Sequence, residues 1–226
     1  MQVVVPYKPY FIFDCDGLLV DSEKYSCSAW EPVLRELGVD FPDNFDYRPI
    51  LGMTAESAIL FFCEIFNLDI KAIDIQKIKQ QKEQEYFKLA SGKLHSFSGV
   101  KSLLKKLQTH NIPRIVASSG AKDKINFNLE EAGLKQFFDE FVSADEVKQG
   151  KPSPDLFLKA AEKLKAPIRE CIVFEDSPLG VQAGKRAGMF VIAVTNTVPV
   201  NKLQEADLII ESFKQLIFED GLLIRI

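Results

Sequence analysis

A short apolar strand that runs directly into two carboxylates is encoded by Tyr10-Phe11-Ile12-Phe13-Asp14-Cys15-Asp16-Gly17. Its first half is apolar and aromatic, which predicts a buried β-strand, and the glycine after the second aspartate predicts a turn. Similar short runs recur along the chain, beginning at Arg114, Glu140, Cys171, Phe190 and Asp207. The opening stretch is therefore expected to be one strand of a larger sheet.

Amphipathic helical patterns separate most of these strand-like runs. We expect helices over residues 100–110, 122–132, 154–164 and 178–187. Gly133 and Gly188 are typical residues after a helix end, whereas Ser153 and Ser177 each precede a proline, as N-caps do. Because alternating helices and continuously apolar strands are typical of a parallel sheet covered on both faces, the sequence predicts an α/β fold with a Rossmann-like core.

Residues 21–91 interrupt this alternation, since they contain helical patterns but no convincing strand. We expect helices over residues 22–37, 55–66 and 71–90. This predicts an α-helical cap domain, residues 21–91, inserted into a core formed by residues 1–20 and 92–226. The two crossings, near Val20-Asp21 and between Ser91 and Phe97, would form a hinge.

Composition and charge exclude several classes of protein. The 226 residues are 46% hydrophobic, which suffices for a packed core, and the net charge of −4 does not suggest a nucleic-acid-binding surface. No run approaches about 18 uninterrupted apolar residues, so we expect no membrane span. Met1–Pro6 lacks a basic region and a long apolar run, so we expect no signal peptide.

The cysteines predict neither a zinc site nor a redox motif. No CxxC pair occurs among Cys15, Cys27, Cys63 and Cys171. Free thiols are typical of a reducing compartment, so we expect a cytoplasmic protein.

Polar residues follow several of the predicted strands and should meet at one edge of the sheet. Ligands of open parallel sheets bind beyond the C-terminal strand ends, at a topological switch point. The residues expected there are Asp14 and Asp16, Ser118-Ser119-Gly120, Lys151, and Glu175-Asp176. Each segment alone is typical of a turn or a helix start, and their joint occurrence in this order is what predicts a site.

The chemistry of this cluster favours a metal and a phosphate group. Clustered carboxylates repel one another unless a cation is present, and Mg²⁺ prefers oxygen ligands that include substrate phosphate. Ser118 and the backbone N–H groups of Ser119 and Gly120 can hold phosphate oxygens near a helix start. Lys151 supplies a positive charge for the same group.

Four segments resemble the four motifs of the haloacid dehalogenase superfamily. They are Phe13-Asp14-Cys15-Asp16-Gly17-Leu18-Leu19-Val20-Asp21-Ser22-Glu23, Ser118 within Val116-Ala117-Ser118-Ser119, Lys151 within Gly150-Lys151-Pro152-Ser153-Pro154-Asp155, and Phe174-Glu175-Asp176-Ser177. The resemblance covers essentially the whole chain, and a helical insert after the first motif resembles that superfamily's first cap type. The nearest branch contains sugar-phosphate phosphatases and proteins similar to β-phosphoglucomutase.

The resemblance implies a Mg²⁺-dependent phosphatase that hydrolyses a small phosphate monoester through an aspartyl-phosphate. It implies that Asp14 is the nucleophile and Asp16 the general acid and base. It further implies that Mg²⁺ is held by the Asp14 carboxylate, the Asp16 backbone carbonyl and Asp176, with Glu175 a direct or water-mediated contact. Ser118, Ser119 and Lys151 are the implied phosphate-binding residues. In the cap, the candidate substrate contacts are Glu23, Gly52, Thr54 and Lys82.

Three alternatives remain open on the sequence. A haloacid dehalogenase would need neither metal nor acid, so Asp16, Glu175 and Asp176 argue against it. A non-catalytic phosphate-binding regulatory protein is disfavoured because every catalytic position is intact. A phosphomutase similar to β-phosphoglucomutase would need cap cations for a second phosphate.

The cap sequence favours water over a sugar hydroxyl as the phosphoryl acceptor. Ser26 and Ala55 stand where β-phosphoglucomutases carry a histidine and an arginine. Arg48 is out of register with that arginine, and only Lys82 matches a cap lysine of the branch. We therefore expect a phosphatase whose partner is a small phosphorylated metabolite. Neither the natural ester nor the oligomeric state follows from the sequence.

Overall fold

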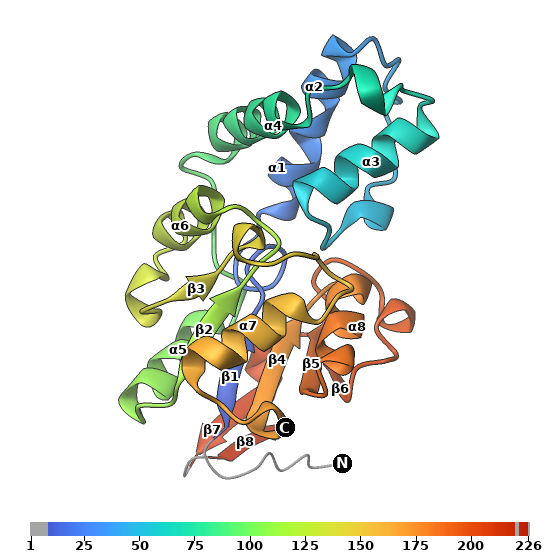
Figure 1. Cartoon of the computed structure of the whole chain (residues 1–226). Coiled ribbons are helices and arrows are strands. Elements are labelled where there is room, and N and C mark those ends of the chain that lie inside the picture. Colours follow the sequence, from blue (N-terminus) through green and yellow to red (C-terminus); the bar gives the residue numbers. More distant parts are fainter. Residues whose placement is uncertain (1–8, 220–221, 226) are drawn as a thin grey trace.

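A parallel sheet forms the centre of the molecule (Figure 1). The computed structural model of the chain describes residues 9–219 and 222–225, so Met1–Pro6, where we expect no signal peptide, lies outside the described residues. The six strands follow the order β3-β2-β1-β4-β5-β6. They are β1 (Tyr10–Phe13), β2 (Arg114–Ala117), β3 (Phe141–Val142), β4 (Cys171–Glu175), β5 (Phe190–Val194) and β6 (Leu208–Ile210). An antiparallel pair that we did not predict, β7 (Leu216–Glu219) and β8 (Leu222–Arg225), follows them.

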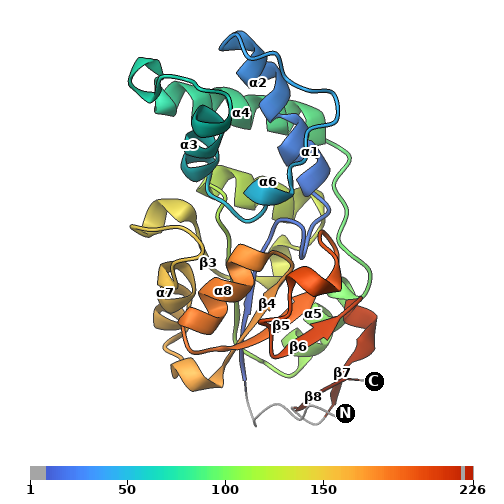
Figure 2. The same cartoon turned by 90° about the vertical axis from the view of Figure 1, so that its right-hand side faces the viewer.

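Helices cover both faces of this sheet. They are α5 (Val100–Thr109), α6 (Lys122–Glu131), α7 (Asp155–Leu164) and α8 (Pro178–Arg186). Helices α7 and α8 lie on one face, and α5 lies on the other (Figure 2). Buried residues of α6 join α5 in the core of that second face. The predicted α/β fold with a Rossmann-like parallel core is confirmed.

Side-chain alternation along the central strands explains the two cores. Phe11 and Phe13 of β1 point into the core beneath α5 and α6, whereas Ile12 points into the core beneath α7 and α8. The neighbouring strand β4 repeats the pattern, so Phe174 stacks on Phe13 with ring centroids 4.8 Å apart. Because both faces are buried, the strands read as continuous apolar runs rather than as alternating ones.

Four further helices stand over the C-terminal ends of the strands (Figure 1). They are α1 (Glu23–Ser28), α2 (Trp30–Glu36), α3 (Ala55–Ile65) and α4 (Ile75–Ala90). We call α1–α4 and their connections the helical insert. Its own apolar core includes Trp30, Phe62 and Ile78, and no strand interrupts it.

Three details of the helices differ from prediction. The helix expected over residues 22–37 is two helices that break at Ala29, because Pro32 lacks an N–H and its ring would clash with the carbonyl of Ser28. The helix expected from residue 71 begins at Ile75, after the N-cap Asp74.

The third detail concerns the predicted N-cap Ser153. Helix α7 begins at Asp155, and the Ser153 hydroxyl donates to the Asp155 carboxylate at 2.8 Å instead of accepting from the helix. By contrast, Ser177 caps α8 as expected, because its hydroxyl accepts from the N–H of Gly180.

The two chain crossings between insert and sheet are hydrogen-bonded to each other. The N–H of Asp21 donates to the carbonyl of His95 at 3.0 Å, and the N–H of Phe97 donates to the carbonyl of Leu19 at 3.2 Å. Entry and exit therefore form a short paired ribbon at the base of the insert.

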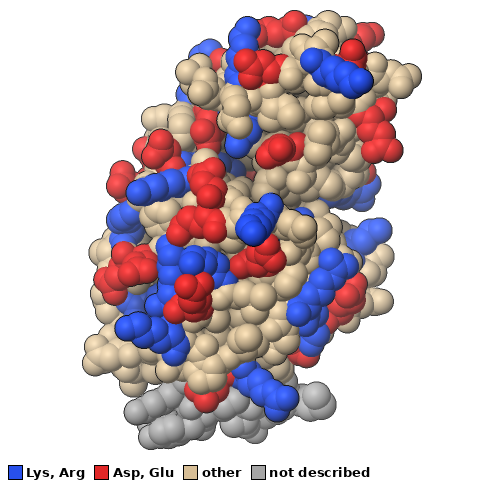
Figure 3. Space-filling model, in the orientation of Figure 1, with Lys and Arg blue, Asp and Glu red and all other residues tan. Residues whose placement is uncertain are grey.

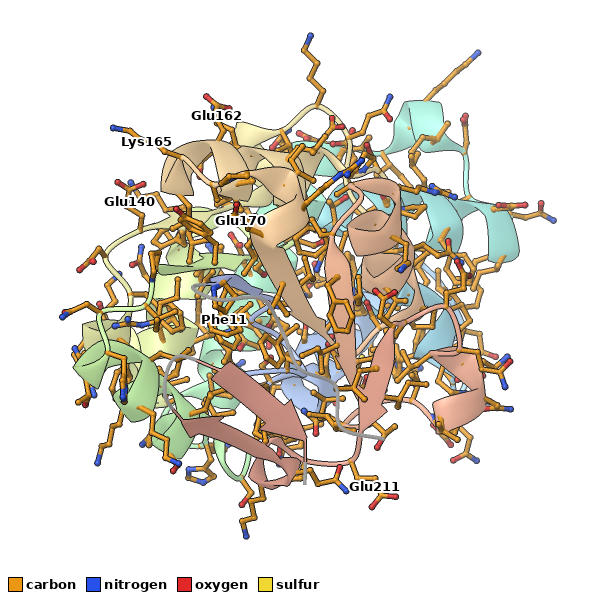
Figure 4. The ribbon with its side chains drawn as sticks, turned by 90° about the horizontal axis from the view of Figure 1, so that it is seen from below. Phe11, Glu140, Glu162, Lys165, Glu170 and Glu211 are labelled. Atoms are coloured by element: carbon orange, nitrogen blue, oxygen red, sulfur yellow. The ribbon has the colours of Figure 1, made fainter. Side chains whose placement is uncertain are left out.

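The surface is charged and mixed in sign. Lysine, arginine and acidic side chains are interspersed over the face seen in Figure 3. Viewed from below, charged side chains point outward, while Phe11 lies in the interior; the outward ones labelled in Figure 4 are Glu140, Glu162, Lys165, Glu170 and Glu211. Within the described ranges, no helix has the length and apolar character needed to cross a membrane, and the four cysteines are unpaired.

Candidate active site

The site is built where the strand order reverses. Asp14 follows the last residue of β1, and Glu175 ends β4, which pairs directly with β1. The chain reaches β2 on one side of β1 and β4 on the other, so a crevice opens between these strand ends. Asp176 follows Glu175 in the turn before α8 and lines the same crevice.

Lys151 links the carboxylates of the two strands. Its ammonium lies 2.5 Å from Asp14 Oδ1 and forms a second ion pair with Glu175 Oε1, and its side chain is fully buried. Both carboxylates raise the pKa of Lys151 although burial opposes them, so this lysine remains charged. A buried charge of this kind is tolerated because it is paired on two sides.

Glu175 is held more firmly than any other carboxylate of the cluster. Its Oε2 accepts from the N–H of Asp176, the N–H of Ser177 and the hydroxyl of Ser177, each at 3.0 Å. Helix α8 can approach this carboxylate only because position 180 is glycine: a Cβ there would lie 1.8 Å from Glu175 Oε1. These contacts make Glu175 a brace for Lys151 and for the start of α8.

The cluster carries more negative than positive charge and fits a hard divalent cation. Carboxylate oxygens of Asp14, Glu175 and Asp176 lie within 4.8 Å of one another. Burial raises the pKa of Asp14 well above its usual range against the charge of Lys151, and burial with repulsion from Glu175 does the same for Asp176. One ammonium does not balance three carboxylates, and oxygen-only donors suit a cation such as Mg²⁺.

Asp16 is not part of this carboxylate cluster, and its side chain contacts Ser22, helix α6 and Ser118 instead. Its Oδ1 accepts from Ser22 Oγ at 2.7 Å, Lys124 Nζ at 2.8 Å and Asn128 Nδ2 at 2.9 Å. Its Oδ2 accepts from Ser118 Oγ at 3.2 Å. Burial alone would raise the pKa of Asp16, but the Lys124 charge and these hydrogen bonds lower it below the ordinary value.

Sequence reasoning missed Lys124 and Asn128. Both lie on α6 one turn apart and are buried beside Ile125 and Leu129. Two polar residues at i and i+4 on the apolar face of a helix were the available signal, because such residues need a buried partner. That partner is Asp16.

The loop after β2 is arranged differently from the expected phosphate cradle. The N–H of Gly120, expected to hold a phosphate oxygen, donates instead to Ser118 Oγ at 3.0 Å, which completes a turn inside the loop. The hydroxyl of Ser119 donates to the carbonyl of Gly52 at 2.9 Å and so ties this loop to the insert.

A cavity of about 630 Å³ lies between the insert and the sheet edge. The predicted site residues that line it are Asp14, Asp16, Glu23, Gly52, Thr54, Lys82, Ser118, Ser119, Lys151 and Asp176. Of the predicted residues, only Glu175 stands behind this lining, where it supports Lys151. The predicted site residues of the insert and of the sheet edge therefore come together around one cavity.

The insert residues in this lining differ in what they contact. Thr54 caps α3 by accepting from the N–H of Ser57 at 3.2 Å. Burial raises the pKa of Glu23 to about 7. Lys82 is 6% exposed and donates to Ser26 Oγ at 2.9 Å, and Lys124 reaches the same hydroxyl at 3.3 Å.

The sequence offered only Lys82 as a cation that could bind a second phosphate, and the structure changes this number. Lys124 adds a second ammonium beside Lys82, although the carboxylate of Asp16 pairs with it at 2.8 Å. Arg48 supplies none, because it is exposed and forms an ion pair with Asp46 at 2.7 Å.

The sequence between residues 11 and 194 matches the haloacid dehalogenase-like hydrolase family. The chain belongs to this family. It is 29% identical over 208 residues to validoxylamine A 7'-phosphate phosphatase of Streptomyces hygroscopicus subsp. limoneus, which covers 91% of this chain and 94% of that protein. It is 31% identical over 206 residues to hexitol phosphatase A of Escherichia coli (strain K12), covering 91% and 92%.

The fold comparison reaches the same branch of the haloacid dehalogenase-like hydrolases. The crystal structure of a β-phosphoglucomutase from Clostridium difficile superimposes with a TM-score of 0.83 at 27% identity, covering 93% of each chain. Together these matches confirm the predicted superfamily, the predicted branch and the prediction that the chain is a hydrolase of the phosphatase kind.

Proposed function

We propose that this haloacid dehalogenase-like hydrolase is a Mg²⁺-dependent phosphatase of a small phosphate monoester, such as a sugar phosphate, and that it works through an aspartyl-phosphate on Asp14. The observation that carries the proposal is the contact of Lys151 with both Asp14 and Glu175 in the cavity between the insert and the sheet edge. The two phosphatase relatives support the reaction class. The unpaired cysteines suit a reducing compartment, and we propose the cytoplasm.

The reaction runs in two displacements on phosphorus. In the first, an Asp14 oxygen forms a bond to phosphorus, the ester P–O bond breaks, and Asp16 gives its proton to the leaving oxygen. In the second, water attacks the phosphorus, its proton passes to Asp16, and the bond from Asp14 to phosphorus breaks. Ser118, Ser119 and Lys151 would hold the transferring group and stabilise its charge.

The metal-binding residues would be Asp14, the backbone carbonyl of Asp16 and Asp176, with Glu175 acting mainly as their brace. A bound Mg²⁺ supplies charge neutralisation for the phosphoryl group and alignment of that group with the nucleophile. Without a cation, the carboxylates would repel a phosphate dianion. Lys151 would keep one oxygen of Asp14 fixed through their ion pair.

We also propose that residues 21–91 act as a cap that closes over the ester. The paired crossings at Asp21–His95 and Leu19–Phe97 support a hinge at its base. Glu23 and Lys82 would contact the leaving group, whereas Gly52 and Thr54 would close the cavity against the loop after β2. Closure would exclude bulk water during phosphoryl transfer.

The test is release of inorganic phosphate from a panel of sugar phosphates by the purified chain with Mg²⁺. We expect turnover that EDTA abolishes and that Asp14→Asn reduces to background, because the nucleophile is gone. Acid-quenched wild-type protein should contain a phosphoryl group that is absent from the Asp14→Asn variant. If the protein binds inorganic phosphate but hydrolyses no ester of the panel, the result would instead support a non-catalytic, regulatory phosphate-binding protein.

One observation favours a second candidate, a phosphomutase. Lys82 and Lys124 place two ammonium groups at one hydroxyl in the cavity, and the fold matches a β-phosphoglucomutase. Because Asp16 already pairs with Lys124, we expect weak binding of a second phosphate and therefore hydrolysis. The ³¹P NMR spectrum of β-glucose 1-phosphate, primed with the bisphosphate, should show little glucose 6-phosphate. Rapid isomerisation without phosphate release would establish the mutase.

A further inference from the structure

The geometry points to Lys124 as a positioning residue that anchors one oxygen of Asp16 and so leaves the other oxygen to exchange the proton with the substrate. This inference rests on the proposed function, and it adds a residue outside the four motifs to that mechanism. Lys124 lies on α6 and forms an ion pair with the side-chain carboxylate of Asp16, whereas the proposed metal ligand of Asp16 is its backbone carbonyl.

The two oxygens of Asp16 have unequal surroundings. Oδ1 receives three donors, from Lys124, Ser22 and Asn128, at 2.7 to 2.9 Å. Among the described residues, Oδ2 receives only the hydroxyl of Ser118, at 3.2 Å. A carboxylate oxygen with three close donors has no capacity left for a proton, whereas Oδ2 keeps that capacity. Of the two oxygens, Oδ2 is therefore the one that can pass a proton to the leaving group.

Oδ2 also lies on the side where the phosphate would sit. Its donor, Ser118, is the first residue after β2, in the loop that lines the cavity, and a Cβ on Gly120 would lie 3.6 Å from Oδ2. Anchoring Oδ1 therefore aims Oδ2 at the reacting group. Among the Oδ1 donors only Lys124 is charged, and hydrogen bonds from charged donors are the stronger ones.

The helical insert supports this anchor from above. Lys124 Nζ lies 3.3 Å from Ser26 Oγ of α1 and 4.8 Å from the ring centre of Tyr86 on α4. The Tyr86 hydroxyl also donates to Asn128 Oδ1 at 2.5 Å, and Asn128 is the second anchor of Asp16. The insert thus contacts both anchors, so Asp16 is fully oriented when the insert is in place.

The effect of removing Lys124 on the rate should depend on the leaving group of the substrate. When the ester P–O bond breaks to give an alkoxide, Asp16 Oδ2 must deliver a proton to that oxygen, so a carboxylate that has lost its charged anchor is less well oriented and slows the step. When acetate leaves from acetyl phosphate, it departs as a stable anion and needs no proton. Loss of Lys124 should therefore slow phosphoenzyme formation from an alkyl phosphate much more than from acetyl phosphate. A general loss of structure would slow both.

The experiment measures phosphoenzyme formation by rapid acid quench in the full chain with Mg²⁺, from glycerol 2-phosphate and from acetyl phosphate. For Lys124→Met we expect formation from glycerol 2-phosphate to slow by about 10²-fold, the lower end of general acid contributions, and formation from acetyl phosphate to change less than about 3-fold. The matched control is Lys122→Met, an exposed lysine on the same helix, which should leave both rates unchanged.

Equal slowing with both substrates, or no slowing with either, would overturn the role of Lys124. If circular dichroism shows that Lys124→Met does not fold, Tyr86→Phe replaces it, because it removes only the hydroxyl that holds Asn128. It should slow glycerol 2-phosphate by several-fold and spare acetyl phosphate, and any other pattern counts against the proposal. If the wild type forms no phosphoenzyme from either substrate, the proposed function itself has failed.

Discussion

At the scale of single residues, the buried ammonium of Lys82 lowers the stability of the fold. Lys82 is 6% exposed, and its ammonium donates to the neutral hydroxyl of Ser26 and lies 5.4 Å from the ring centres of Trp30 and Tyr86. Burial, with repulsion from Lys124 added, lowers the pKa of Lys82 to about 8. Such a residue is expected where a substrate, rather than the fold, requires the charge.

The first prediction is that Lys82→Met raises the melting temperature at pH 7 while lowering activity. The folded pKa of about 8 is below the ordinary 10.5, so the unfolded chain binds more protons between these values. The stability of the wild type should therefore rise, relative to the variant, as the pH increases from 8 to 10.5. At about 1.4 kcal/mol per unit, the free energy of unfolding should shift by up to roughly 3 kcal/mol.

Thermal melts of both proteins at a series of pH values measure this difference. Lys77→Met, an exposed position on the same helix, is the matched control and should show no such trend. A variant less stable than the wild type by the same amount at every pH would show that Lys82 mainly supports packing.

At the scale of elements, the strands of the parallel sheet were predicted correctly from local sequence, whereas the break between α1 and α2 was missed. The strands were predictable because both faces are buried, so each strand is a short apolar run bounded by polar residues. The break between α1 and α2 was missed because the apolar periodicity continues through Pro32, although that proline interrupts the backbone hydrogen bonds.

The second prediction concerns the start of α3. Thr54→Ala removes the side-chain acceptor for the N–H of Ser57 and should lower the free energy of unfolding by about 1 kcal/mol. Thr54→Ser keeps the oxygen and should keep the stability. Urea unfolding of the three proteins checks this.

The same two variants test whether Thr54 also contacts the substrate. Its methyl group packs toward Gly150, where a Cβ would lie 2.5 Å away. If Thr54 acts only as a cap, KM should stay within about 2-fold in the serine variant. A large rise in KM there would assign the methyl group to substrate binding.

At the scale of the whole molecule, the carboxylate cluster that we propose binds Mg²⁺ joins the ends of two strands and the turn before a helix. Asp14 directly follows β1, and Glu175 and Asp176 come from β4 and the turn that follows it. A cation that binds this cluster only in the folded state must stabilise the entire fold.

The third prediction is that Mg²⁺ raises the melting temperature of EDTA-treated protein. At about 100 times the dissociation constant the gain is about 2.7 kcal/mol, which corresponds to roughly 5 to 10 °C for a chain of this size. Asp176→Asn should lose most of the shift, because one negative ligand is gone. Differential scanning calorimetry checks both proteins, and an equal shift in the variant would mean that Mg²⁺ binds elsewhere.

The sequence alone was sufficient for the family, the parallel sheet and the residues at the strand ends. The reason is physical: in a parallel sheet, residues that directly follow strands must gather at one edge, whatever the rest of the chain does. Asp14, Lys151 and Asp176 could therefore be expected to meet from their positions next to strands and helix starts.

The tertiary structure decided which side chains surround Asp16. Asn128 is 112 residues away from Asp16 in the chain, and Ser118 is 102 residues away. No local pattern links such residues, because their contact depends on how α6 packs against the sheet and how the insert sits above it. The anchoring of Asp16 by Lys124 and the second ammonium beside Lys82 follow from that packing, since these partners of buried charges are chosen in space rather than along the chain.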